Sequence, residues 1–130
     1  MFSLNQINNI HEQLGNLATL ADYLIELRKI GVEKYDTYIS DGHSEYFGKD
    51  NRMIISPAIH EYFPISEVSD RENLLVHLKL HEEGKTDYFR MTKGLADSGI
   101  EKWTFDTNKM TIVYYNLNGE EMLIEKIEQE

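Results

Sequence analysis

The chain has 130 residues, of which 41% are hydrophobic and 28% charged, as in one ordinary folded domain. With 13 Lys and Arg against 23 Asp and Glu, its formal net charge is −10. This argues against direct nucleic-acid binding, because such a site needs basic side chains to replace counterions. The absence of cysteine excludes disulfides, thiolate catalysis and cysteine-ligated metals. No apolar run approaches the roughly 20 residues of a membrane helix. We therefore expect a cytoplasmic protein without a membrane partner.

The first half of the chain begins with two predicted helices. Ser3 and Gln6 form a capping-box pattern ahead of apolar residues at helical spacing, and Gly15-Asn16 ends this helix. The second helix ends at Gly31, after two cations that suit the helix dipole. Its apolar stripe is formed by Leu17, Leu20, Leu24 and Leu27.

Three strands follow, because the apolar period changes from helical to alternating near residue 32. Lys34, Asp36 and Tyr38 alternate with the residues between them over the first strand. Asp41-Gly42 is a hairpin dipeptide, and residues 43–47 form the returning strand. The third strand covers residues 53–55.

The second half repeats this order after a connection over residues 56–69. Ser69 and Glu72 form a second capping-box pattern, which begins a helix that Gly84 ends. Thr86 is expected to cap a fourth helix. Three strands complete the chain, over residues 100–105, 110–115 and 121–127. In the connection, the side chains expected to be buried are Ile59, Tyr62, Phe63 and Ile65.

An internal repeat relates the two halves. At an offset of 68 residues, the segment 31–35 (GVEKY) aligns with 99–103 (GIEKW) without a gap. After one inserted residue, 53–55 aligns with 122–124. The sequence thus predicts an α+β fold, an internally duplicated ααβββ–ααβββ unit with antiparallel sheets, helices packed on one side and pseudo-twofold symmetry. We expect one domain over 1–130, with pseudo-repeats of about 1–56 and 69–127 joined by 57–68.

Four motifs in a fixed order resemble those of the YdfO-like family. They are Asp41-Gly42-His43, Tyr46-Phe47-Gly48-Lys49-Asp50, Gly84-Lys85-Thr86-Asp87-Tyr88 and Ser98-Gly99-Ile100-Glu101-Lys102-Trp103. This family contains small uncharacterised bacterial and prophage proteins, some of them labelled phage envelope proteins. The resemblance implies a duplicated α+β fold in a bacterial cytosolic or phage setting. It implies no established activity, and it transfers no site residues.

The candidate binding residues are Asp41, His43, Tyr46 and Trp103. A carboxylate beside an imidazole can orient it as a general base, although Asp-Gly also suits a type I′ turn without any chemistry. The copy of this hairpin in the second half carries Lys109 and Met110. His43 is therefore a departure from the repeat, and such asymmetric features are where we expect a binding function.

Two further clusters are weighed against ordinary structural roles. His77 and His81 stand four residues apart on one helix, where they could share a metal ion or pack at the edge of the core. Glu33 and Glu101 begin equivalent strands, where they could face one another across the pseudo-axis or form ion pairs at the rim of the sheet. We predict no metal and no cofactor.

The leading functional hypothesis is a non-enzymatic module that binds a protein or a small-molecule ligand. The first alternative is a small hydrolase or isomerase that uses a His–carboxylate pair. The second alternative is an acidic phage-type protein that masks a DNA-binding partner. A homodimer formed by pairing of an exposed edge strand remains open from the sequence.

Overall fold

The computed structural model describes residues 2–15 and 19–127. Asn16 and Leu17, which the sequence assigns to the first helix end and the second helix, lie outside these residues. Four helices and six strands are present in the described part of the chain. They are α1 (Leu4–Leu14), α2 (Leu20–Lys29), β1 (Lys34–Tyr38), β2 (Ser44–Phe47), β3 (Met53–Ile55), α3 (Arg71–Glu82), α4 (Tyr88–Asp97), β4 (Ile100–Asp106), β5 (Thr111–Asn116) and β6 (Glu121–Lys126).

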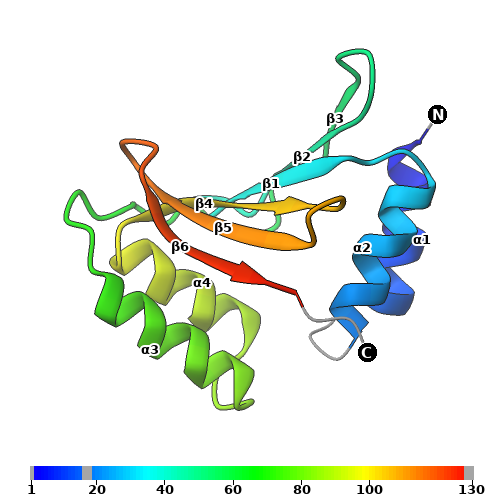
Figure 1. The fold of residues 1–130 in the computed structure, drawn as a ribbon. Helices are drawn as coiled ribbons and strands as arrows, with labels where there is room; N and C mark the ends of the chain where they lie inside the picture. The colour runs from blue at the N-terminus through cyan, green and yellow to red at the C-terminus, as the bar shows by residue number, and fades with distance from the viewer. Residues whose placement is uncertain (1, 16–18, 128–130) are drawn as a thin grey trace.

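The two halves of the chain meet along their first strands. The six strands form one antiparallel sheet in the order β3-β2-β1-β4-β5-β6, so that β1 and β4 lie side by side at its centre (Figure 1). Each half contributes three neighbouring strands. This is the predicted ααβββ–ααβββ architecture, and it joins both halves in a single sheet.

The strand register confirms the duplication residue by residue. In the first half, β1 and β2 pair Tyr35 with Tyr46. In the second half, Trp103 pairs with Tyr114, and both of these residues lie 68 positions later. The inserted residue of the second half falls at an irregularity between Tyr114 and Tyr115.

The pseudo-twofold axis passes between β1 and β4. Asp36 lies opposite Thr104 across this strand pair, and the two positions are repeat equivalents. A pair of equivalent positions that face each other can lie only on the symmetry axis. Asp36 and Thr104 therefore mark the centre of the sheet.

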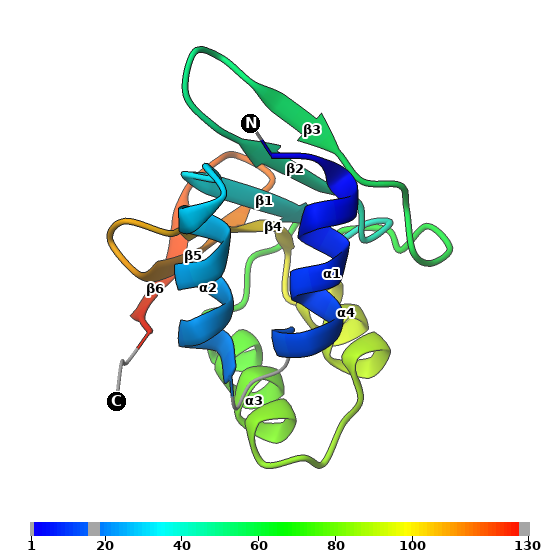
Figure 2. The ribbon, with the colours of Figure 1, turned by 90° about the vertical axis from the view of Figure 1, so that its right-hand side faces the viewer.

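All four helices lie on one face of the sheet, with α1 and α2 at one end and α3 and α4 at the other (Figures 1 and 2). The core forms between this face and the helices. Equivalent residues of the two halves anchor it: Leu27 and Leu95 are both fully buried, as are Val32 and Ile100. Burying such side chains is the main favourable contribution to folding.

One predicted helix cap is confirmed and two are wrong. Ser3 accepts a hydrogen bond from the Gln6 amide, and the capping box is complete. Helix α3 is capped by Asp70, one residue after Ser69, and its carboxylate accepts from the amide of Asn73. Helix α4 is capped by Asp87, while Thr86 lies before the cap with a buried hydroxyl that has no partner in the described residues. In both cases an aspartate follows the hydroxyl residue and is an equally good capping residue.

The connection between the halves is only partly buried. Residues 56–70 contain no helix or strand. Phe63 and Ile65 pack against the core as expected, but Ile59 is 54% exposed and Tyr62 is 72% exposed. The expectation of burial is therefore wrong for two of these four side chains.

No helix among the described residues has the length and apolar character needed to cross a membrane.

Candidate functional site

The sheet divides the four predicted binding residues between its two faces. Side chains alternate along each strand, so Tyr46 points to the helices while Glu45 and Phe47 point away from them. Trp103 lies on the helix side with Tyr46. His43 contacts both Asp41 and Glu45, and Glu45 lies on the side that carries no helix. We call this helix-free side the open face.

Asp41 and His43 are brought together as predicted, and Glu45 joins them. The His43 ring nitrogens lie 2.6 Å from Asp41 Oδ1 and 3.0 Å from Glu45 Oε2. The His43 amide also donates to Asp41 Oδ1 at 2.9 Å. Gly42, with φ of +77°, provides the left-handed conformation that the turn between Asp41 and His43 requires. The imidazole is thus held between two carboxylates.

This geometry shifts the ionisation of both partners. Partial burial disfavours the imidazolium, but hydrogen bonds to Asp41 and Glu45 outweigh it and raise the pKa of His43. Burial also disfavours ionised Asp41, but the backbone and side-chain hydrogen bonds from His43 outweigh it and lower the pKa of Asp41. The pair is stabilised in its charged form.

The same contacts bear on the catalytic hypothesis. A general base needs a ring nitrogen that is free to accept a proton from its substrate. Both nitrogens of His43 are occupied by carboxylates. The arrangement suits a fixed cation that positions its neighbours better than it suits a proton acceptor.

The contribution of this cluster to stability should depend on pH. We compare the wild type with His43→Phe, which keeps an aromatic ring beside Tyr38 and removes the charge. Since the pKa of folded His43 is raised, its contribution is complete below the ordinary value of 6.5 and is lost as the pH rises through the folded pKa. Since the pKa of folded Asp41 is lowered, its contribution is complete above 3.8 and is lost as the pH falls through the folded pKa. The difference in unfolding free energy should be largest between those two values, at about 1 kcal/mol after screening by solvent.

Urea unfolding across a pH series measures this difference. A difference that stays constant from acid to alkaline pH would contradict the proposed charge pair.

A second charged cluster occupies the centre of the open face. The Asp36 side chain is only 8% exposed, and Lys102 Nζ lies 3.4 Å from Asp36 Oδ2. The hydroxyl of Thr104 donates a hydrogen bond to the other carboxylate oxygen of Asp36. Although burial opposes its charge, the nearby Asp36 raises the pKa of Lys102. A preformed ion pair thus lies beside the pseudo-twofold axis, at the centre of the open face.

Aromatic rings connect the two clusters. The Tyr38 ring stacks on His43 with centroids 4.6 Å apart and planes inclined by 3°. Lys102 Nζ lies 5.7 Å from the Tyr38 ring centre and 5.5 Å from that of Tyr115. Both distances are in the range of cation–π interactions. His43, Tyr38, Lys102 and Tyr115 form one continuous row, which we call the open-face row.

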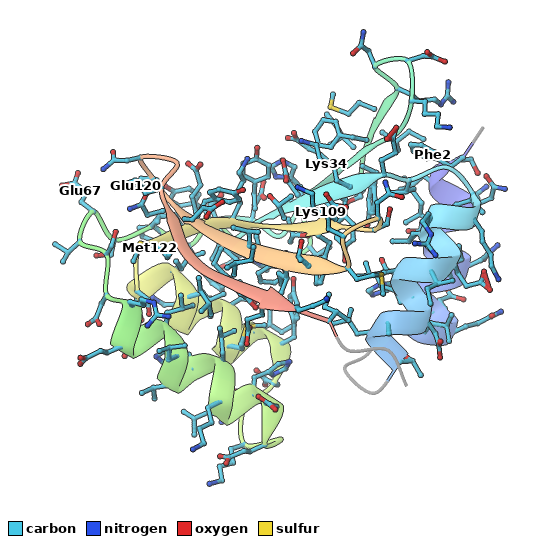
Figure 3. The ribbon with its side chains drawn as sticks, viewed as in Figure 1. Phe2, Lys34, Glu67, Lys109, Glu120 and Met122 are labelled. Carbon is cyan, nitrogen blue, oxygen red and sulfur yellow. The ribbon has the colours of Figure 1, made fainter. Side chains whose placement is uncertain are left out.

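The outer strands add apolar side chains to the open face. Met53 and Ile55 on β3 are 47% and 53% exposed, and Ile124 on β6 is 58% exposed. Ile55 and Ile124 are equivalent in the repeat, so these apolar groups flank the central charges from both sides. Lys34, labelled in Figure 3, also lies on this face and covers the Phe47 ring at 5.1 Å.

Tyr46 and Trp103 belong to an aromatic layer beneath the helices. Tyr46 stacks on Tyr35 at 4.9 Å, and Trp103 contacts Tyr88 edge to face at 6.3 Å. Tyr46 is 7% exposed and Trp103 is 8% exposed. Burial raises the pKa of Tyr46, so its hydroxyl stays neutral. The Trp103 Nε1 is buried without a partner among the described residues.

The two helical histidines make separate contacts. His81 Nδ1 lies 3.1 Å from the carbonyl oxygen of Thr86. His77 packs over Gly94, where an added Cβ would lie 2.3 Å from its ring nitrogen. Within residues 2–15 and 19–127, no three His, Cys, Asp or Glu side chains are arranged to hold a metal ion.

Of the two interpretations of Glu33 and Glu101, the one in which they face each other across the pseudo-axis is wrong. The carbonyl of Glu33 accepts from the Thr107 amide at one end of the β1–β4 pair, and that of Glu101 accepts from Ile39 at the other. Six residues of strand separate these ends, which is about 20 Å. In an antiparallel pair, equivalent residues approach only near the axis, and that position belongs to Asp36 and Thr104.

Three central residues of the open face were not predicted as site residues: Asp36, Tyr38 and Lys102. The alternation along β1 places Asp36 and Tyr38 on one face, and this much is visible in the sequence. Their contact with Lys102 depends on the pairing of β1 with β4, which brings together Asp36 and Lys102 from positions 66 apart in the sequence. No local pattern specifies that pairing.

The whole described sheet lies within one family match. A family model with the description "Protein of unknown function (DUF1398)" matches residues 8–126, from within α1 to the end of β6. None of the curated proteins matches this sequence. Since the family model covers most of the chain, the protein belongs to the DUF1398 family of proteins of unknown function.

Proposed function

We propose that this protein is a non-enzymatic binding module that receives a protein partner on the open face of its sheet. The observation that carries the proposal is the open-face row, where rings and charges are fixed against one another without a helix covering them. The motifs that resemble the YdfO-like family support a bacterial or prophage, cytoplasmic setting for this module.

The composition of the open face supports a macromolecular partner. Aromatic residues are enriched in protein interfaces, and a charge held by a neighbour costs less to desolvate than a mobile one. Exposed Met53, Ile55 and Ile124 provide apolar contact on both sides of the row. Two hollows of the described surface lie away from this face, at α3–β6 and beside the β2–β3 turn. A sheet face with exposed apolar side chains on both outer strands suits another protein surface better than an enclosed small molecule.

Site-specific photocrosslinking in cells of the native host tests this proposal. A benzophenone amino acid replaces Ile55 or Ile124 on the open face, one variant at a time. Matched controls carry it at Val76 or Phe89, which are similarly exposed, at 54% and 50%, on the helix side. We expect one adduct of the same mass from both open-face variants and none from the helix-side variants.

A second change separates specific binding from general adhesion. Tyr38→Ser in the Ile55 crosslinking variant removes the ring that joins His43 to Lys102, and should weaken the adduct several-fold. Adducts from the helix-side positions alone, or an adduct that Tyr38→Ser leaves unchanged, would contradict the proposal.

A further inference from the structure

A hollow of about 340 Å³ lies at the corner of the first half, away from the open-face row. It is bounded by Phe2, by Ile30 and Gly31, which follow α2, and by the β2–β3 turn. Figure 3 labels Phe2 at the start of α1, below that turn. The volume is at the lower end of the range for small-molecule sites.

The turn provides two cationic side chains to this hollow, Lys49 and Arg52. The Arg52 Nε is buried and has no hydrogen-bond partner in the described residues. Asp50 also lines the hollow, but no ion pair within 4.0 Å joins it to Lys49 or Arg52 in the described part of the chain. A buried guanidinium N–H without an acceptor is costly, because its bond to water is lost and not replaced.

The floor of the hollow is apolar. The Arg52 guanidinium carbon lies 6.0 Å from the centre of the Phe2 ring. Ile30 lies beside them, and Gly31 leaves the floor open because it has no side chain. Phe2 itself is only 3% exposed, so a planar group would contact Ile30 and the Gly31 backbone above it, while an attached anion meets Arg52.

The second half provides an internal comparison, because its equivalent corner is filled. An added Cβ at Gly99 would lie 2.7 Å from the Val68 carbonyl oxygen and 3.0 Å from Ser69 Cα. At the equivalent Gly31, the nearest atom would belong to the Phe2 ring, at 3.6 Å. The matching turn, residues 116–120 (NLNGE), carries no basic side chain. The hollow and its positive charge are thus specific to the first half of a duplicated fold.

We infer that this corner is a binding site for a small organic anion, a carboxylate or phosphate carried on a planar apolar body. The terminal N–H groups of the Arg52 guanidinium are paired donors of the kind that such oxyanions accept, and Lys49 adds a second positive charge. The protein has a net charge of −10, so a hollow lined by two basic side chains, unpaired in the described part of the chain, is opposite in sign to the protein as a whole. The inference rests on residues outside the open-face row. Its test is therefore independent of whether the proposed protein partner exists.

Chemical-shift titration of the ¹⁵N-labelled full chain tests the inference. The probes are benzoate and phenyl phosphate, with neutral benzamide and inorganic phosphate as comparisons. We expect benzoate and phenyl phosphate to bind with dissociation constants on the order of 1 mM, as suits such small ligands. The amide signals that move should be those of Gly31, Gly48 and the turn around Asp50. Benzamide should bind about tenfold more weakly, because it lacks the charge.

Arg52→Gln should weaken benzoate binding about tenfold or more, and Arg52→Lys should give an intermediate loss because it keeps the charge without the paired donors. Lys109→Gln is the matched control: it removes an exposed lysine from the β4–β5 turn and should change nothing. Equal binding of benzamide and benzoate, shifts centred elsewhere, or full affinity in a folded Arg52→Gln variant would overturn the inference. Binding of inorganic phosphate as tight as that of phenyl phosphate would overturn the apolar part of the ligand assignment.

Discussion

Replacement of Gly99 by alanine should destabilise the protein by about 3 kcal/mol or more. The residue has a φ of +87°, which costs a side-chain-bearing residue about 1–2 kcal/mol. The new Cβ would also lie 2.7 Å from the carbonyl oxygen of Val68. That segment of backbone cannot move freely, because the Asp70 amide donates to the carbonyl of Ser98 at 2.9 Å. Relieving the overlap adds about 1–3 kcal/mol.

Gly31→Ala is the matched control in the first half. Its φ of +105° imposes a similar backbone cost, but an added Cβ would meet only the Phe2 ring, at an ordinary contact distance of 3.6 Å. We expect a loss of about 1–2 kcal/mol. Urea unfolding of both variants measures the difference. Equal losses would show that the two corners of the duplicated fold are filled alike, contrary to their geometry.

Lys102→Met should cost about 2–3 kcal/mol of unfolding free energy. The Asp36 carboxylate is almost fully enclosed and would lose its one ion-pair partner in the described residues, keeping the Thr104 hydroxyl. Removing one member of a buried pair leaves an uncompensated charge, which costs about 3–5 kcal/mol when burial is complete. The Lys102 side chain is 27% exposed, so water reaches the pair and lowers that cost. Methionine keeps the apolar stem between the tyrosine rings, so the change isolates the charge.

Two further variants complete this test. Lys34→Met changes the equivalent lysine of the first half, which is exposed and covers Phe47, and should cost less than about 0.5 kcal/mol. Asp36→Thr combined with Lys102→Met removes both charges and places at position 36 the residue found at its repeat equivalent, Thr104. The double variant should recover most of the stability lost by Lys102→Met alone. No recovery would mean that the lysine acts through packing and not through Asp36.

Much of the local structure could be predicted because its causes lie within a few residues. The capping box of Ser3 and Gln6, the turn at Asp41-Gly42 and the change of period near residue 32 each depend on neighbouring backbone groups. The capping errors at Ser69 and Thr86 have the same local origin. Each hydroxyl residue is followed by an aspartate, and the sequence pattern does not decide which of two good caps the chain will use.

The candidate site could be predicted only in part. Asp41 and His43 are neighbours in a tight turn, so their contact follows from the sequence. The sequence-based prediction groups Tyr46 and Trp103 with them, but strand alternation and helix packing place both on the opposite face. Asp36 and Lys102 are 66 positions apart, and their ion pair exists only because β1 pairs with β4.

The sequence by itself determined the order of the elements and the duplication, since repeated segments with the same periodicity form the same local structures. Only the tertiary structure decided that the halves join through β1 and β4, that all helices cover one face, and that the two equivalent corners differ. The physical reason is that the register between distant strands is set by the packing of both halves at once. The residues of β1 and β4 that contact each other are thus decided by the whole fold and not by either segment alone.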